Sequence, residues 1–139
     1  MSDAANLVSR MLLSAVFIFS GYLKFVNVTT ITDNPGTKRI MDLVAAGAPA
    51  PVWLSYLPAA MEMAGGLAII VGFKTLWVAL AFVIYLIIIT PLGHPFWLLE
   101  GAARSANQVN FNENLAILGG YLLLATTGPG RYALDNRSR

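Results

Sequence analysis

Residues 52–73 read VWLSYLPAAMEMAGGLAIIVGF, an apolar run whose single charged residue is Glu62. About 20 consecutive apolar residues in a helix cross the ~30 Å hydrocarbon core of a bilayer, and this run reaches that length. A carboxylate near the middle of a bilayer costs about 2.5 kcal/mol or more, so it normally faces a partner, a cavity or a pathway. We therefore predict a membrane protein in which Glu62 has a role in function.

The composition of the whole chain supports the same class of protein. Of its 139 residues, 57% are hydrophobic and 12% are charged, against about 45–50% and 25% in soluble domains. The net charge of +2 comes from a few Lys and Arg residues beside apolar segments, and no basic patch interleaved with aromatic residues indicates nucleic-acid binding. The chain has no cysteine, so it forms no disulfide. One histidine and scattered carboxylates make a poor zinc or iron site, so we expect no metal and no intrinsic cofactor.

The apolar runs predict an all-α integral membrane protein, a four-transmembrane-helix antiparallel bundle that forms one domain over residues 1–139. The turn at residues 72–75 is too short for anything but a hairpin between two spans. Thr37 caps a short amphipathic helix between the first two spans, which we expect along the membrane surface. A polar loop with Arg104 is expected before the last span. The predicted spans cover residues 6–28, 52–73, 75–93 and 109–127.

Four spans place both termini on the same side of the membrane, and the basic residues indicate which side that is. The terminal side carries five basic residues and the opposite side carries four. Because basic residues favour the cytoplasmic side, we expect both termini in the cytoplasm. The two sets are Arg10, Lys74, Arg131, Arg137 and Arg139 against Lys24, Lys38, Arg39 and Arg104.

Polar residues of different spans are predicted to meet in the outward-facing half of the bundle. Side chains lean towards the N-terminus of their helix, so Lys24 of the first span and Glu62 of the second lean together, and we predict an ion pair between them. Pro91 closes the third span, and His94 follows it at the same depth as the polar start of the fourth. The candidate ligand-binding or proton-relay residues are Glu62, Lys24, His94, Asn114, Asn110 and Arg10. The first five come from all four spans and are expected around one outward-facing pocket. Arg10 lies on a stripe of the first span that recurs at helical spacing and should face the bundle, namely Arg10, Ser14, Phe17, Gly21 and Lys24.

The same residues also have a purely structural interpretation. Polar groups inside a membrane hold helices together, each contributing well under ~2 kcal/mol. Lys24 and Glu62 then form a permanent pair, and His94 anchors a loop. Asn110 and Asn114 cap the fourth helix or bind backbone groups of neighbouring helices in this interpretation. The residues leave both interpretations open.

Five segments, in this order and spacing, together resemble the DoxX family over nearly the whole chain. They are FIFSGYLKF at 17–25, MEMAGGLAIIVGF at 61–73, TPLGHPFW at 90–97, FNENLAILGGYLLL at 111–124 and GPGRYALD at 128–135. The resemblance implies a four-helix bacterial inner-membrane protein, within a wider group that includes the DoxD-type subunit of thiosulfate:quinone oxidoreductase. Glu113 departs from the pattern, because a lysine is expected beside Asn114. The residues that match it are Arg10, Gly21, Lys24, Glu62, Gly66, His94, Trp97 and Asn114.

The leading hypothesis is an auxiliary subunit of a membrane-associated oxidoreductase complex, in respiration or oxidative-stress defence. Such a subunit would bind a quinone, a lipid or another small ligand between its helices and would not be catalytic on its own. One alternative is a small transporter or proton-coupled carrier in which Glu62 and Lys24 exchange partners. Another is a purely structural subunit of a larger membrane complex. The expected partners are membrane lipid and other membrane or oxidoreductase subunits, or further copies of the chain.

Overall fold

The computed structural model describes residues 3–27, 38, 42–43, 53 and 56–136, and these residues form helices and turns without a strand. The long helices are α1 (Asp3–Val26), α4 (Tyr56–Val71), α5 (Thr75–Gly93) and α6 (Gly101–Thr127), and the short 3-10 helices are η2 (Phe96–Leu98) and η3 (Leu134–Asn136). The all-helical prediction is therefore confirmed. Lys38 and residues 42–43 are helical, but the rest of the predicted surface helix lies outside the described residues.

Two stretches are long and apolar enough to cross a membrane. They are α1 and the segment Thr75–Leu98, with mean hydropathies of 1.5 and 2.4. α4 has 16 residues, which at 1.5 Å per residue makes it about 24 Å long. The described helix is therefore shorter than the predicted span over residues 52–73, of which residues 52 and 54–55 lie outside the description.

The start of α6 differs from the predicted boundary. The helix begins at Gly101, with Glu100 as its N-cap residue, so Arg104 lies in the helix and not in a loop. Asn110 and Asn114 are interior residues of α6, and the idea that they cap it is wrong. Residues 101–108 are polar, and a polar helical turn carries no apolar periodicity by which a span could be recognised.

The end of α5 agrees with the predicted span over residues 75–93. Pro91 lies inside the helix, which continues to Gly93, and the backbone N–H of His94 donates to Thr90 O at 2.9 Å. Proline removes one backbone donor, but a single missing bond in the last turn does not stop the helix there. His94 is the C-cap residue, as expected from its place at the end of this apolar run.

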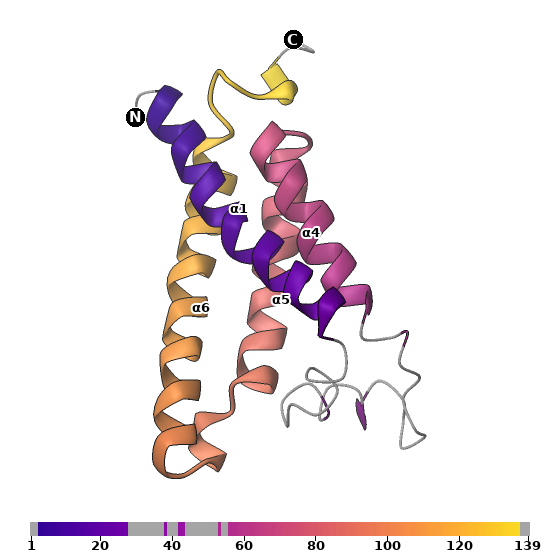
Figure 1. Ribbon diagram of the computed structural model, residues 1–139. Helices are drawn as coiled ribbons and strands as arrows, with labels where there is room; N and C mark the ends of the chain where they lie inside the picture. The colour runs from indigo at the N-terminus through magenta and orange to yellow at the C-terminus, as the bar shows by residue number, and fades with distance from the viewer. Residues whose placement is uncertain (1–2, 28–37, 39–41, 44–52, 54–55, 137–139) are drawn as a thin grey trace.

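Successive helices run in alternating directions, and they pack mainly as two pairs (Figure 1). α1 packs against α4, and α5 packs against α6, with less extensive contact between the pairs. The predicted hairpin between α4 and α5 is confirmed, because only residues 72–74 separate them. In that turn Gly72 has φ 70° and Lys74 has φ 46°.

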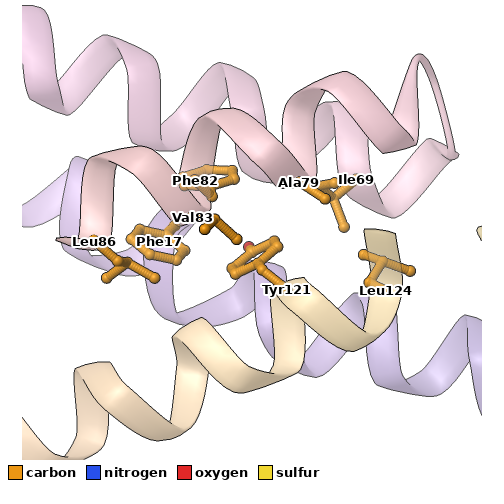
Figure 2. Packing of buried hydrophobic residues seen from close by; sticks show 8 residues of the cluster. All are labelled: Phe17, Ile69, Ala79, Phe82, Val83, Leu86, Tyr121 and Leu124. Atoms are coloured by element: carbon orange, nitrogen blue, oxygen red, sulfur yellow. The ribbon is translucent and has the colours of Figure 1, made fainter. Parts of the chain in front are cut away.

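Aromatic rings from three helices form the centre of the apolar core (Figure 2). The ring of Phe82 on α5 stacks on Phe17 of α1, with centroids 4.3 Å apart, and on Tyr121 of α6 at 4.8 Å. Such ring pairs contribute about 0.5–1.5 kcal/mol beyond their buried area. Ile69 joins the cluster from α4, so all four long helices meet there.

Small residues let α1 approach α4 closely, beside the predicted polar stripe of α1. A Cβ on Gly21 would lie 2.7 Å from the carbonyl oxygen of Ala59, and one on Gly66 would lie 3.2 Å from that of Ser14. This close approach brings the end of α1 against the start of α4. The buried residues of α1 lie along one face of the helix. They are Asn6 and four residues of the predicted stripe, Arg10, Ser14, Phe17 and Gly21.

Candidate functional site

Glu62 and Lys24 form the predicted ion pair. Glu62 is 2% exposed, and its Oε1 accepts a hydrogen bond from Lys24 Nζ. The Lys24 side chain is 24% exposed, whereas the carboxylate is almost fully enclosed. Glu62 follows Tyr56, the first described residue of α4, by six positions, or about 9 Å of helix. Because nine residues follow Glu62 to the end of α4 at Val71, this side chain lies close to the middle of the helix, as the apolar run 52–73 predicted.

Tyr85 of α5 is a third member of this site, and the sequence reasoning missed it. Its hydroxyl donates to Glu62 Oε1 with an O···O distance of 2.6 Å. The ring of Tyr85 rests edge-on against Phe17, with centroids 6.3 Å apart. The sequence did hold a sign of this role, because Tyr85 carries the only polar side-chain group between Val78 and Ile89. A buried tyrosine hydroxyl usually has a hydrogen-bond partner.

The second carboxylate oxygen of Glu62 is the unusual feature of the site. Oε2 is buried and has no hydrogen-bond partner among the described residues. An unsatisfied buried acceptor costs about 1–3 kcal/mol, and more when it is charged. Lys24 and Tyr85 both donate to Oε1, so Oε2 can accept either a proton or a hydrogen bond from a bound molecule.

His94 lies at the same end of the molecule, but its hydrogen-bond partner is a residue that the sequence reasoning did not select. Its Nδ1 is 3.4 Å from Asn107 Oδ1 on α6. Lys24 and Glu113 lie within electrostatic range of the imidazole. The structure therefore brings His94 towards Lys24 without placing it in contact with the carboxylate of Glu62.

The two candidate asparagines of α6 are not part of the hydrogen-bonded triad formed by Lys24, Glu62 and Tyr85. Asn110 is exposed and Asn114 is half-buried, and neither donates or accepts a side-chain hydrogen bond within the described part of the chain. Their predicted role in ligand binding stays a prediction. Residues 3–27 and 56–136 contain no cluster of three His, Asp or Glu side chains that could hold a metal ion.

Arg10 lies far from Glu62, at the other end of α1. It is fully buried and separated from Lys24 by 14 residues, about 21 Å of helix. Its guanidinium donates to Ile69 O at 3.2 Å and to Ile70 O at 3.1 Å, two carbonyls of the last turn of α4, and also to Tyr132 O. Arg10 thus caps α4 and holds the C-terminal segment, which is a structural position.

The C-terminal segment 128–136 folds over this end of the helices. The Asp135 carboxylate accepts the backbone N–H of Lys74 and of Thr75, each at 2.7 Å, at the start of α5. Burial alone would raise the pKa of Asp135, but the hydrogen bonds from Thr75 and Lys74 and the charge of Arg10 together hold this pKa below its ordinary value. The pattern GPGRYALD therefore encodes a clamp on the α4–α5 turn.

The groove that the structure describes lies elsewhere, between α1 and α6. It has a volume of about 380 Å³ and a mostly apolar lining. Glu62, Lys24 and His94 do not line it. This groove is therefore a different hollow from the outward-facing polar pocket that the sequence predicted around Glu62, Lys24 and His94.

Comparison with known proteins places the chain in a family. The family model described as DoxX matches residues 5–95. The Escherichia coli (strain K12) inner membrane protein YphA is 34% identical, over 94% of this chain and 88% of its own length. Inner membrane protein YqjF of the same strain is 36% identical, over 97% of this chain and 92% of its length.

A more distant relative is the Surfeit locus protein 4 homolog of Schizosaccharomyces pombe, 27% identical over 63% of this chain and 30% of that protein. No solved structure matches. The two bacterial relatives, both named as inner membrane proteins, support a bacterial inner-membrane location. Because the family model covers residues 5–95 and both relatives align over nearly the full chain, the protein belongs to the DoxX family.

Proposed function

We propose that this chain binds a small ligand in the bacterial inner membrane and acts as an auxiliary subunit of an oxidoreductase complex. The observation that carries the proposal is the buried Glu62 carboxylate. One of its oxygens accepts hydrogen bonds from Lys24 and Tyr85, and the other has no partner in the part of the chain that the structure describes. A pair that served packing alone would gain from satisfying both oxygens, since half-satisfied buried charges are costly.

The free oxygen favours a ligand that donates a hydrogen bond. A quinol hydroxyl has this property, and the quinol becomes a quinone when its two hydroxyl groups lose two protons and two electrons in total, which the oxidoreductase complex would accept. Lys24 is the side chain of the triad that reaches solvent or headgroups, being 24% exposed. The ligand therefore enters from the end of the molecule where α1 ends and α4 begins.

The proposal includes four spans with cytoplasmic termini. The alternating helix directions and the short α4–α5 turn support this topology (Figure 1). α4 is about 6 Å shorter than a ~30 Å hydrocarbon core, a mismatch that local bilayer thinning accommodates at modest cost. Arg10 and Lys24 interact with other groups of the protein, so we do not count them among the basic residues that set the orientation. Four basic residues then remain on the terminal side and three on the opposite side. The remaining sets are Lys74, Arg131, Arg137 and Arg139 against Lys38, Arg39 and Arg104.

The test is purification of the tagged chain in native nanodiscs, followed by mass spectrometry of the bound proteins and small molecules. Co-purification of oxidoreductase subunits or a quinone with the wild type is expected. The double variant Lys24→Met with Glu62→Gln should fold but lose them, because it removes both charges together. A double variant that folds and retains the same molecules would refute a ligand role for the pair and favour a structural one.

A proton-coupled carrier is the second candidate, and the placement of His94 favours it. His94 lies at the end of α5, within electrostatic range of Lys24, which in turn contacts Glu62. In this proposal a proton passes from His94 at the end of α5, by way of Lys24, to the buried carboxylate of Glu62. Reconstituted vesicles with a pH-sensitive dye inside should then acidify in a Glu62-dependent way, and a rate equal to that of Glu62→Gln would exclude it.

A further inference from the structure

The groove between α1 and α6 takes no part in the Glu62 site. The two helices lie side by side where the termini lie and diverge towards the other end (Figure 1). Gly120 keeps the groove open, because a Cβ at this position would lie 2.7 Å from Leu13 Cδ2. The apolar lining comes from Leu12, Leu13 and Val16 of α1 and from Ile117, Gly120 and Leu123 of α6.

One end of the groove is polar, and its two hydroxyl groups present acceptors. The Ser9 hydroxyl donates to Ala5 O at 2.9 Å, and the Thr127 hydroxyl donates to Leu123 O at 2.8 Å. Each hydroxyl has a single proton, so both side chains present oxygen lone pairs to the groove. Asn6 uses its amide nitrogen on Gly128 O at 3.0 Å, while its buried Oδ1 has no partner among the described residues.

We infer that this groove holds one acyl chain of a phospholipid whose headgroup donates hydrogen bonds, such as phosphatidylethanolamine or phosphatidylglycerol. The change along the groove, from apolar at Val16 to polar at Ser9 and Thr127, matches the change from chain to headgroup in such a lipid. The acceptor rim discriminates against phosphatidylcholine, whose headgroup has no donor. The exposed Arg131, whose backbone N–H donates to Asp3 Oδ1, lies beside this rim and is available to the lipid phosphate.

This lipid site is independent of the proposed ligand at Glu62. The polar end of the groove is near the start of α1, whereas Lys24 is near the end of that helix. Loss of one site therefore leaves the other intact, and separate variants distinguish them. Gly120→Leu should empty the groove without touching Lys24, Glu62 or Tyr85.

The test is native mass spectrometry of the chain after reconstitution with each of the three lipids and extraction into detergent. The wild type should retain one molecule of phosphatidylethanolamine or phosphatidylglycerol, about tenfold more than phosphatidylcholine, because lost hydrogen bonds of this kind reduce affinity by that order. Gly120→Leu should lose the bound lipid. Gly119→Leu is the matched control, since a Cβ there meets nothing within 4 Å, and it should retain the lipid.

Thr127→Val supplies a second readout that does not depend on filling the groove. It keeps the side-chain volume and removes the acceptor oxygen, so the total amount of bound lipid should persist while the preference over phosphatidylcholine falls.

Equal retention of all three lipids by the wild type would overturn the headgroup assignment. Equal loss in Gly119→Leu and Gly120→Leu would overturn the location. A lipid-free dimer would show that a second copy fills the groove. If Gly120→Leu does not fold, Gly120→Ala should lower retention in part.

Discussion

Replacing Lys24 by methionine should destabilise the protein strongly, although the lysine itself is only partly buried. The substitution leaves the Glu62 carboxylate, 2% exposed, with Tyr85 as its remaining donor. Removing one partner of a buried pair typically costs about 3–5 kcal/mol, because the other charge stays buried without compensation. Tyr85 satisfies one lone pair of Oε1, so we expect about 3 kcal/mol, the lower end of this range.

The reverse substitution, Glu62→Gln, should cost less, about 1–2 kcal/mol. Lys24 is two residues from the end of α1 and 24% exposed, so its ammonium can extend to the headgroups when the carboxylate is gone. The double variant with both substitutions carries no buried charge. Its stability should approach that of the wild type, so the coupling energy between the two sites should approach the sum of the two single losses, about 4–5 kcal/mol.

Reversible unfolding of the purified protein in mixed micelles, with increasing sodium dodecyl sulfate, measures these differences. Leu115→Ala, on an exposed position of α6, controls for nonspecific effects of substitution. Additive losses, with the double variant as unstable as the sum of the single ones, would refute the idea that the charges depend on each other. So would a smaller effect for Lys24→Met than for Glu62→Gln.

Three further substitutions test other parts of the structure. Tyr85→Phe keeps the ring against Phe17 but removes a donor to Glu62, so unfolding should become easier by about 1–2 kcal/mol in the same titration; an unchanged midpoint contradicts the hydrogen bond. Asp135→Asn should abolish a pH dependence: because the folded-state pKa of Asp135 lies below its ordinary 3.8, its contribution is complete above about pH 4 and is lost as the pH falls through the lowered pKa. Thermal midpoints at pH 6 and pH 3 should therefore differ more in the wild type than in the variant, and equal differences would count against the clamp. Gly72→Ala should destabilise by more than ~1 kcal/mol, since φ is 70° and the added Cβ would lie 2.4 Å from that of Ala133; Gly93→Ala, with nothing within 4 Å of its Cβ, should leave the thermal midpoint close to the wild-type value.

The Lys24–Glu62 pair shows how far sequence reasoning reaches into the site. A lone acid in an apolar run needs a partner, and few basic residues in the chain lie in or near apolar runs. The small number of basic candidates and the direction in which side chains lean therefore predicted the pair. Tyr85 did not follow, because an apolar helix has no polar periodicity that marks which face a single tyrosine occupies. The packing of α5 beside α4 decides that its hydroxyl reaches Glu62 Oε1.

Arg10 shows the opposite case. Its position on the stripe with Ser14 and Phe17 was readable from helical spacing, and these residues are buried as that spacing predicts. The spacing says which face of α1 is turned inward, but it does not say what lies opposite. The carbonyl of Ile69 meets Arg10 because α4 packs against α1, and that of Tyr132 meets it because the C-terminal segment folds back across the end of α4.

The sequence by itself determined the membrane class, the helical fold, the hairpin at residues 72–75 and the need to neutralise Glu62. These properties depend on local composition and spacing, since burial of charge and backbone in lipid is costly wherever it occurs. Tertiary structure alone decided that α6 begins eight residues early, that Asn107 and not Asn110 meets His94, and that the groove opens between α1 and α6. Contacts between helices far apart in the chain set these features, and no local pattern encodes such contacts.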